Sequence, residues 1–293
     1  MRAPLRQLRV VLEMIKFEHT LFALPFALMG LALAAGGWPG WRTLGWILVA
    51  MVGARSAAMG FNRLVDREID AANPRTRGRA LPAGLVTPRF VALFVAASSG
   101  LLLLAAWQLN PLCFALAPLA LAVLLGYSYT KRFTALSHLV LGAALGGAPL
   151  GAWIAVRGSV APAPFALAAA VVFWVAGFDV LYALQDREFD RATGLRSIPV
   201  RLGVHGALWL SGLFHLGTLA LLALLPALYP PGLGWAYWLG FTGCVALLAY
   251  QHTIVRPGDL SRLDAAFFTA NGVLSVWLFL ATAVDLALAG RGG

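Results

Sequence analysis

Charged residues, cysteines and lysines are scarce in this sequence, and each shortage excludes a class of protein. Charged side chains make up 12% of the 293 residues and apolar ones 60%, which is not the composition of a soluble domain. The two cysteines, Cys113 and Cys244, stand alone within apolar runs, so we expect neither a disulfide framework nor a zinc site. The sequence also lacks a Ser/His or Cys/His motif for covalent catalysis.

The sequence is rich in long apolar runs. Windows of about 20 residues, enough to cross a bilayer as a helix, find nine such runs. Because they use nearly the whole chain, they predict an all-α integral membrane protein with a single transmembrane domain, 1–293. The runs span 18–37, 43–62, 88–108, 111–130, 136–156, 163–183, 204–225, 233–251 and 264–287.

The basic residues predict how the chain is oriented in the membrane. Of the 22 Lys and Arg residues, 18 fall in the N-terminal segment and in alternate loops, at 63–89, 131–132, 187–201 and 256–262. By the positive-inside rule, these segments are cytoplasmic and the C-terminus lies outside, in the inner (plasma) membrane of the cell. The formal net charge of +10 is therefore a topology signal and does not predict nucleic-acid binding.

Three segments are expected at the membrane surface. Residues 1–16 carry apolar side chains at helical spacing, which predicts a helix lying in the interface. Segments 63–89 and 187–203 contain Arg, Pro and Gly, and they predict cytoplasmic cap loops.

Two nearly identical acidic stretches, DREID at 66–70 and DREFD at 186–190, hold six of the twelve acidic residues. Each continues an apolar run, and residues four apart share one face of a helix, so the two aspartates of each stretch face the same way. The glutamates between them, Glu68 and Glu188, are expected to point elsewhere. The four aspartates are Asp66, Asp70, Asp186 and Asp190.

Two facing pairs of carboxylates predict a metal–diphosphate site. Such groups repel one another unless cations lie between them, and Mg²⁺ typically takes one or two protein carboxylates and completes its shell with water and phosphate oxygens. Asn62, four residues before Asp66, and Arg55, seven residues before Asn62, extend the first stripe. Arg63 and Arg79, the latter in the adjoining loop, are further candidates for binding the diphosphate. The alternative is that both motifs are solvated helix ends at the membrane surface.

A third polar stretch, GYSYTKRFT at 126–134, faces the same predicted side as the acidic motifs. Lys131 and Arg132 are candidates for phosphate binding, and Tyr127 for contact with the acceptor or an allylic cation. Tyr182 is a similar candidate because it lies four residues before the second motif. The alternative for this stretch is an aromatic belt with a positive-inside anchor.

Arg55 lies within an apolar run, where an arginine is costly and usually functional. It lies about three helical turns before Asp66, so it is our candidate for binding the carboxylate of an aromatic acceptor. The alternative is a structural pair with a buried acid such as Asp179.

The motifs together resemble a known family. NRLVDREIDAANPRT resembles the first motif, NxxxDxxxD, of the UbiA superfamily of intramembrane prenyltransferases, and QDREFD is similar to its second motif. YSYTKRFT resembles the stretch between them, so the likeness spans roughly residues 15–205. Among subfamilies, the chain most resembles the 4-hydroxybenzoate polyprenyltransferases of ubiquinone and menaquinone biosynthesis, including the futalosine branch.

The resemblance implies a helical fold around a central cavity, in which Mg²⁺ bridges both acidic motifs to a polyprenyl diphosphate. It implies prenyl transfer to an aromatic acid, 4-hydroxybenzoate or a related naphthoate, within the bilayer. The metal and diphosphate residues that it implies are Asn62, Asp66, Asp70, Arg79, Lys131, Arg132, Asp186 and Asp190.

Three other functions fit part of the pattern. A transporter also has matched halves and paired acids, but its ionisable groups would cluster near the bilayer midplane rather than at one interface. A related prenyltransferase with another acceptor, such as haem or a chlorophyll precursor, is the second alternative. A purely structural membrane protein would have no use for the repeated motif.

Overall fold

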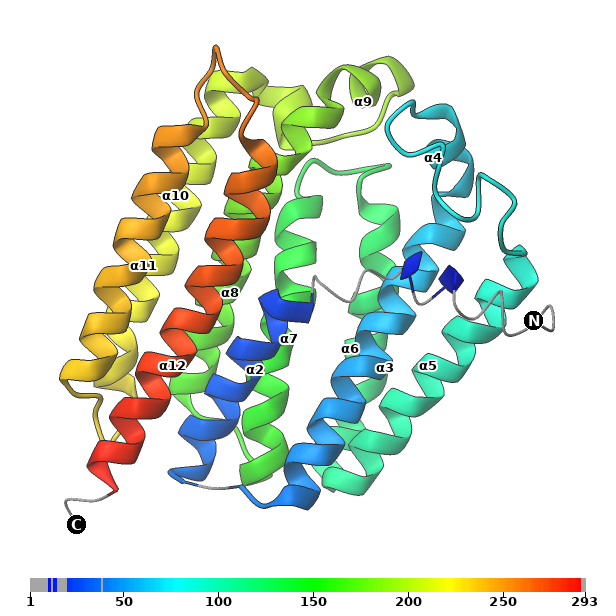
Figure 1. Ribbon diagram of the computed structural model, residues 1–293. Helices are drawn as coiled ribbons and strands as arrows, with labels where there is room; N and C mark the ends of the chain where they lie inside the picture. The colour runs from blue at the N-terminus through cyan, green and yellow to red at the C-terminus, as the bar shows by residue number, and fades with distance from the viewer. Residues whose placement is uncertain (1–9, 12, 15–19, 38, 291–293) are drawn as a thin grey trace. The chain divides into compact units, whose positions relative to one another are not determined.

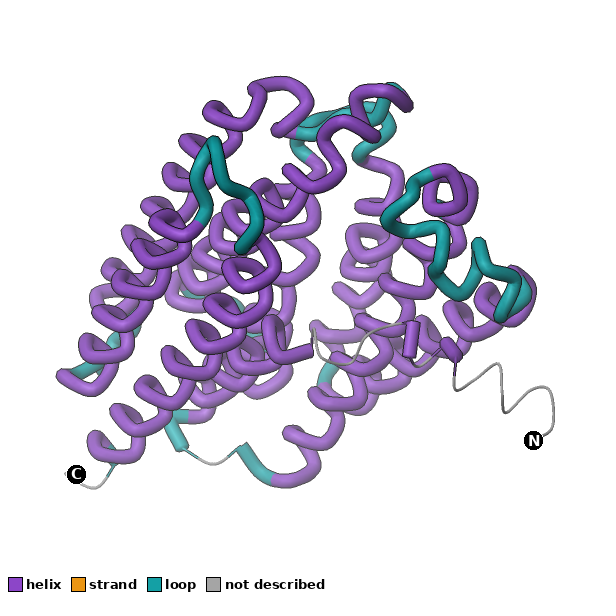
Figure 2. The backbone as a smooth tube through the Cα atoms, turned by 45° about the horizontal axis from the view of Figure 1, so that its top comes forward, coloured by secondary structure: helices purple, strands orange, loops and turns teal. Residues whose placement is uncertain are grey.

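The computed structural model describes residues 10, 11, 13, 14, 20–37 and 39–290, and this part of the chain is made of helices and loops without β-strands (Figure 2). Its long helices are α2 (Thr20–Ala35), α3 (Trp41–Val65), α5 (Pro88–Leu109), α6 (Pro111–Thr130), α7 (Ser137–Arg157), α8 (Pro162–Tyr182), α10 (Ile198–Leu228), α11 (Trp235–Ile254) and α12 (Asn271–Ala289) (Figure 1). Shorter elements are α4 (Arg67–Ala72), the 3-10 helix η2 (Ala183–Asp186), α9 (Arg187–Thr193) and the π-helix η3 (Ala265–Ala270).

The helices follow the apolar runs of the sequence. Each of the nine predicted runs overlaps one of the long helices, and η3 lies at the start of the last run. Among the described residues, seven helices are long and apolar enough to cross a membrane, and a shorter apolar helix spans Phe22–Ala35. The chain is therefore an all-helical integral membrane protein, whereas nine crossings stay a prediction.

The chain divides into two compact units, the first comprising Met1–Thr20 and Trp41–Tyr129 and the second Leu21–Gly40 and Thr130–Gly293. In the first unit, α3 packs along α5. Gly53 permits this approach, because a Cβ there would lie only 2.8 Å from the backbone nitrogen of Leu102.

The predicted surface helix 1–16 lies mostly outside the described residues. Of its described side chains, Val11 and Met14 are buried in the first unit, in a cluster with Leu81 and Val91. These two side chains therefore pack on protein, while the interfacial position of the whole segment stays a prediction.

The second unit is built around closely packed helices and an aromatic core. In α7, a Cβ at Gly146 would lie 2.7 Å from the carbonyl oxygen of Ala168 in α8, so the two helices touch at small residues. Trp174 of α8 is fully buried among aromatic rings, and its Nε1 donates to Asn271 Oδ1 over 2.9 Å. This core packs around α8, whose C-terminal end leads through η2 into the second acidic motif.

The predicted cap loop 187–203 contains helix. After α9, Ser197 caps α10 by accepting a hydrogen bond from Val200 N at 3.4 Å. The helical path is interrupted at Gly203, whose φ of 70° is favourable for glycine alone. The apolar run predicted from residue 204 begins directly after this break.

Candidate active site

The first acidic motif lies at a break between two helices. α3 ends at Val65, Asp66 has φ −90° and ψ 5°, and α4 begins at Arg67. Backbone hydrogen bonds continue through the break, from Asp66 N to Asn62 O (2.9 Å) and from Asp70 N to Asp66 O (2.7 Å). The predicted common face of these residues is therefore kept, although the sequence did not predict the break.

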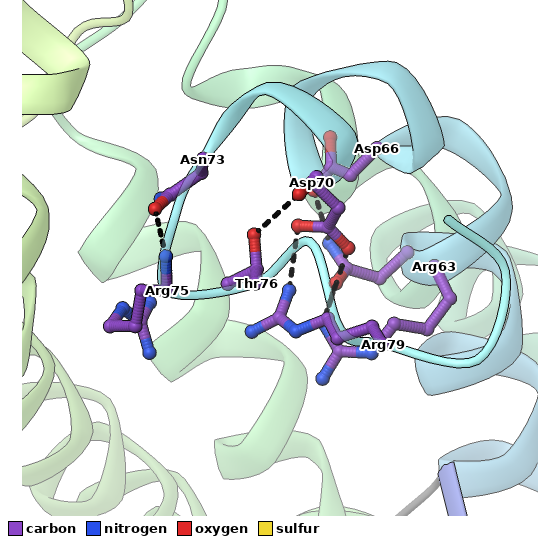
Figure 3. A network of polar contacts seen from close by, with 8 residues as sticks. Arg63, Asp66, Asp70, Asn73, Arg75, Thr76 and Arg79 are labelled. Atoms are coloured by element: carbon purple, nitrogen blue, oxygen red, sulfur yellow. Dashed lines mark hydrogen bonds and ion pairs between the residues drawn. The ribbon is translucent and has the colours of Figure 1, made fainter. Parts of the chain in front are cut away.

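Five predicted site residues form one polar network in the first unit (Figure 3). Asp66 and Asp70 are only 2% and 4% exposed. Asn62 Nδ2 donates to Asp66 Oδ2 over 3.0 Å, and Arg79 Nη1 pairs with Asp70 Oδ1 at 2.7 Å. Arg63 Nη1 lies 4.0 Å from Asp70 Oδ2, so two guanidinium groups offset the charge of one buried carboxylate.

The loop after α4 is folded onto the motif by residues that the sequence analysis did not single out. Buried Thr76 donates its hydroxyl to the backbone oxygen of Asp70 over 3.0 Å. Asn73 Oδ1 accepts from Arg75 N at 2.9 Å and closes a turn (Figure 3). This turn brings Arg79 back to the motif, and the Asn-Pro pair that opens it was the available signal in the sequence.

Two of the three predicted acceptor residues also meet in the first unit. Arg55 lies on α3, largely shielded from solvent, within electrostatic reach of Tyr127 of α6. Asp179, the structural partner that we considered for Arg55, instead accepts a hydrogen bond from His138.

The second acidic motif lies at a similar break. α8 ends at Tyr182, η2 follows, and Asp186 has φ −100° and ψ 0° before α9 begins. The half-buried carboxylate of Asp190 lies within electrostatic reach of Asp186 and Lys131, and it accepts a hydrogen bond from the Ser197 side chain. The structure thus brings the second motif and Lys131 together.

Arg196 ties the loop after α9 to the connection between α6 and α7. Its backbone nitrogen donates to the carbonyl oxygen of Lys131, and its Nη1 donates to that of Phe133, both over 2.7 Å. Exposed Arg132 lies between these two anchors. The backbone nitrogen and the guanidinium of Arg196 therefore link the connection that carries Lys131 and Arg132 to the loop that follows the second motif.

His138 of α7, which the sequence analysis did not assign to the site, contacts both α8 and α10. Its Nδ1 lies 2.7 Å from Asp179 Oδ2, and its Nε2 accepts from the backbone nitrogen of Ile198 at 3.4 Å. Because the amide is an obligatory donor, Nε2 carries a lone pair and Nδ1 carries the proton that goes to Asp179. This fixed ring holds the start of α10, next to Ser197 and hence to Asp190.

Tyr182, the third predicted acceptor residue, packs in the aromatic core of the second unit. Its ring stacks on Phe267 with centroids 4.1 Å apart and an interplanar angle of 28°. Phe268 meets it edge-on at 6.2 Å. The structure therefore places an aromatic surface one turn before Asp186.

The donors of both motifs suit Mg²⁺. Among the described residues, no three His, Cys, Asp or Glu side chains gather as a metal site, and each motif offers two aspartate carboxylates. That number matches what Mg²⁺ takes from a protein when phosphate and water complete its shell. Asp70 Oδ2 is buried and accepts no hydrogen bond from the described residues, and Arg63 Nη1 at 4.0 Å lies beyond hydrogen-bonding distance, so this oxygen keeps a lone pair for a metal ion.

The fold defines a helical membrane protein, and each of its two compact units carries one of the acidic motifs. The chain belongs to the UbiA prenyltransferase family, whose profile matches residues 23–283.

Relatives and solved structures agree with this assignment. The chain is 36% identical over 272 residues to a 4-hydroxybenzoate octaprenyltransferase of Cupriavidus necator, covering 92% of this chain and 93% of the relative. It is 32% identical over 244 residues to one from Citrobacter koseri, covering 82% and 83%. The apo structure of a UbiA homolog from Aeropyrum pernix K1 is similar with a TM-score of 0.83 and 34% identity, over 92% of this chain and 98% of that one. A UbiA homolog from Archaeoglobus fulgidus bound to DMAPP and Mg²⁺ shares the fold at a TM-score of 0.72 and 20% identity, over 97% and 99%.

Proposed function

We propose that this chain transfers a polyprenyl group from a prenyl diphosphate to an aromatic acid, 4-hydroxybenzoate or a related hydroxylated naphthoate, in quinone biosynthesis. The names of the relatives from Cupriavidus necator and Citrobacter koseri support this acceptor. One observation carries the proposal: each of the two acidic motifs is coupled to a basic side chain, Asp70 to Arg79 and Asp190 to Lys131.

The polar residues around the motifs bind the donor. Basic side chains and an amide hold the diphosphate oxygens, with guanidinium forks matching the phosphate geometry. The four aspartates would hold Mg²⁺, which would supply positive charge to stabilise the leaving diphosphate. The residues assigned to the diphosphate are Asn62, Arg63, Arg79, Lys131 and Arg132.

The aromatic and apolar surroundings guide the second half of the reaction. As the bond between the allylic carbon and the diphosphate oxygen breaks, the faces of Tyr127 and Tyr182 stabilise the allylic cation. Arg55 binds the acceptor's carboxylate and orients its ring. The ring carbon beside the hydroxyl then forms the new bond to the allylic carbon, and that ring carbon loses a proton. The membrane setting keeps water from capturing the cation.

The protein acts within the membrane as a single domain. Nine crossings place the N-terminus in the cytoplasm and the C-terminus outside, in the inner membrane. Segments 63–89 and 187–203 cap the site on the cytoplasmic side, where a water-soluble aromatic acid and the diphosphate headgroup enter. The segregation of basic residues to alternate loops supports this orientation.

The test is a product assay with a panel of acceptors. Purified protein is incubated with Mg²⁺, a labelled prenyl diphosphate and 4-hydroxybenzoate, a hydroxynaphthoate, haem or a chlorophyll precursor, and products are identified by mass spectrometry. We expect a prenylated aromatic acid. A product with haem or the chlorophyll precursor alone would assign another acceptor, and substrate uptake into vesicles without product would favour a transporter.

A further inference from the structure

A groove in the second unit holds ionisable residues that prenyl transfer does not use. It lies between α10 and α11, which run side by side (Figure 1), and has a volume of about 860 Å³. Most of its lining is apolar, from Trp209 through Leu213 and Leu216 to Leu219. Its polar lining comes from His205, His215, His252 and Arg256.

The helix packing explains why the groove exists. α10 packs extensively on α8, and α11 packs on α12, whereas α10 and α11 have much less contact with each other. Gly212 leaves further space between them. A Cβ added there would lie 3.9 Å from Cε1 of His252, which is an ordinary contact, so alanine fits whereas a longer side chain would occupy the groove.

Two of the groove's histidines form a hydrogen-bonded pair inside apolar surroundings. His215 Nδ1 and His252 Nε2 are 2.8 Å apart. His215 is only 2% exposed and packs against Gly177, where a Cβ would collide with its ring. His252 is half-buried and lines the groove, and its hydrogen bond to His215 fixes its ring. Ionisable side chains within membrane helices are costly and mark functional sites.

The groove is most polar near one end, although His215 lies between Leu213 and Leu216. His205 and Arg256 lie near the ends of their helices, since α11 ends at Ile254 and α10 is interrupted at Gly203. From His205 the lining continues to Leu219, about 20 Å along the helix. One leaflet's hydrocarbon is about 15 Å deep, so the groove spans a headgroup and an acyl chain.

We propose that this groove binds an anionic phospholipid. The phosphate lies among His205, His252 and Arg256, and one acyl chain runs along the leucines of α10. Among the described residues, no acidic side chain lines the groove, and Arg256 gives its polar end a positive charge. The carboxylate of Asp259 lies outside the lining and accepts hydrogen bonds from the backbone nitrogen and the hydroxyl of Ser261. The proposal is independent of the acceptor and donor of the prenyl reaction.

The test is lipid retention measured by native mass spectrometry on the purified, delipidated full-length chain. Phosphatidylglycerol and phosphatidylcholine with identical acyl chains are added in turn, and inorganic phosphate is added as a competitor. We expect preferential retention of one phosphatidylglycerol, with millimolar phosphate failing to displace it. Arg256→Ala should weaken retention about fivefold, while Arg262→Ala, an exposed arginine of the same loop that does not line the groove, should leave it unchanged.

A pair of glycine variants keeps the proposal testable if a charge variant folds poorly. Gly212→Leu should abolish retention and Gly212→Ala should preserve it, with both variants required to elute as monodisperse protein. Equal retention of both lipids, or retention that survives Gly212→Leu, would overturn the proposal. Displacement by inorganic phosphate would identify a small-anion site instead, and displacement by a prenyl diphosphate would assign the groove to that substrate.

Discussion

Asp66 and Asp186, 120 positions apart in the sequence, have the same backbone conformation and the same place in their helices. Each is the residue before a short helix, with φ and ψ of −90° and 5° for Asp66 and −100° and 0° for Asp186. This sparsely populated region of backbone space is common at active sites. The two acidic motifs are thus alike in conformation as well as in sequence, which supports equivalent roles for their first aspartates.

The glutamate of each motif provides a matched control for the aspartates. The side chains of Glu68 and Glu188 are 85% and 78% exposed and pair with the adjacent Arg67 and Arg187, as their place on the helix predicted. We expect Asp66→Ala or Asp186→Ala to lower kcat by about a hundredfold or more, because charge on the leaving group loses its stabilisation. Glu68→Ala should stay within about twofold of the unchanged enzyme in the same assay. Equal damage from the glutamate change would contradict the assignment.

Arg55 is expected to act on one substrate only. If it binds the acceptor's carboxylate, Arg55→Leu should raise the KM of the aromatic acid by about a hundredfold, the scale of a charge-assisted hydrogen bond in a shielded site. The KM of the prenyl diphosphate should change little and serves as the internal control. A parallel rise in both constants, or loss of folded protein from membranes, would make Arg55 a structural residue.

His138 is expected to position the second motif through the start of α10. Since its Nε2 accepts from Ile198 N, His138→Gln, which keeps an acceptor at that distance, should retain more activity than His138→Asn. The loss of activity should appear mainly as a higher KM for the prenyl diphosphate. A shift of the start of α10 would displace Asp190 together with Lys131. Steady-state kinetics and thermal unfolding of both variants distinguish a positioning role of His138 from simple destabilisation. Destabilisation would lower the amount of active enzyme without changing KM.

Most of the fold could be predicted from the sequence, because hydrophobicity alone identifies helices that face lipid. The nine apolar runs match nine helices, and the four-residue spacing of the aspartates placed Asp66 and Asp70 on one face. The helix breaks at Asp66 and Asp186 could not be predicted, because no proline or glycine lies at either position. The partnership of His138 with Asp179 depends on packing between residues 41 positions apart, which a single sequence does not report.

The orientation in the membrane can be measured with single cysteines after Cys113 and Cys244 are replaced. Gly78→Cys and Thr193→Cys lie at exposed positions in the two predicted cap segments and should react with an impermeant reagent from the cytoplasmic side. Ser159→Cys, exposed between α7 and α8, should react from the opposite side. Reaction of all three from one side would overturn the nine-crossing topology.

The joint use of both acidic motifs is the central claim, and binding of an unreactive prenyl thiolodiphosphate measured by calorimetry tests it most directly. We predict binding that requires Mg²⁺ and is lost with a chelator. Asp66→Ala and Asp186→Ala should each weaken it strongly, and the double variant should be little worse than either single one, because the two residues act on one metal–diphosphate unit. Binding that is independent of Mg²⁺, or losses that simply add, would contradict a shared site.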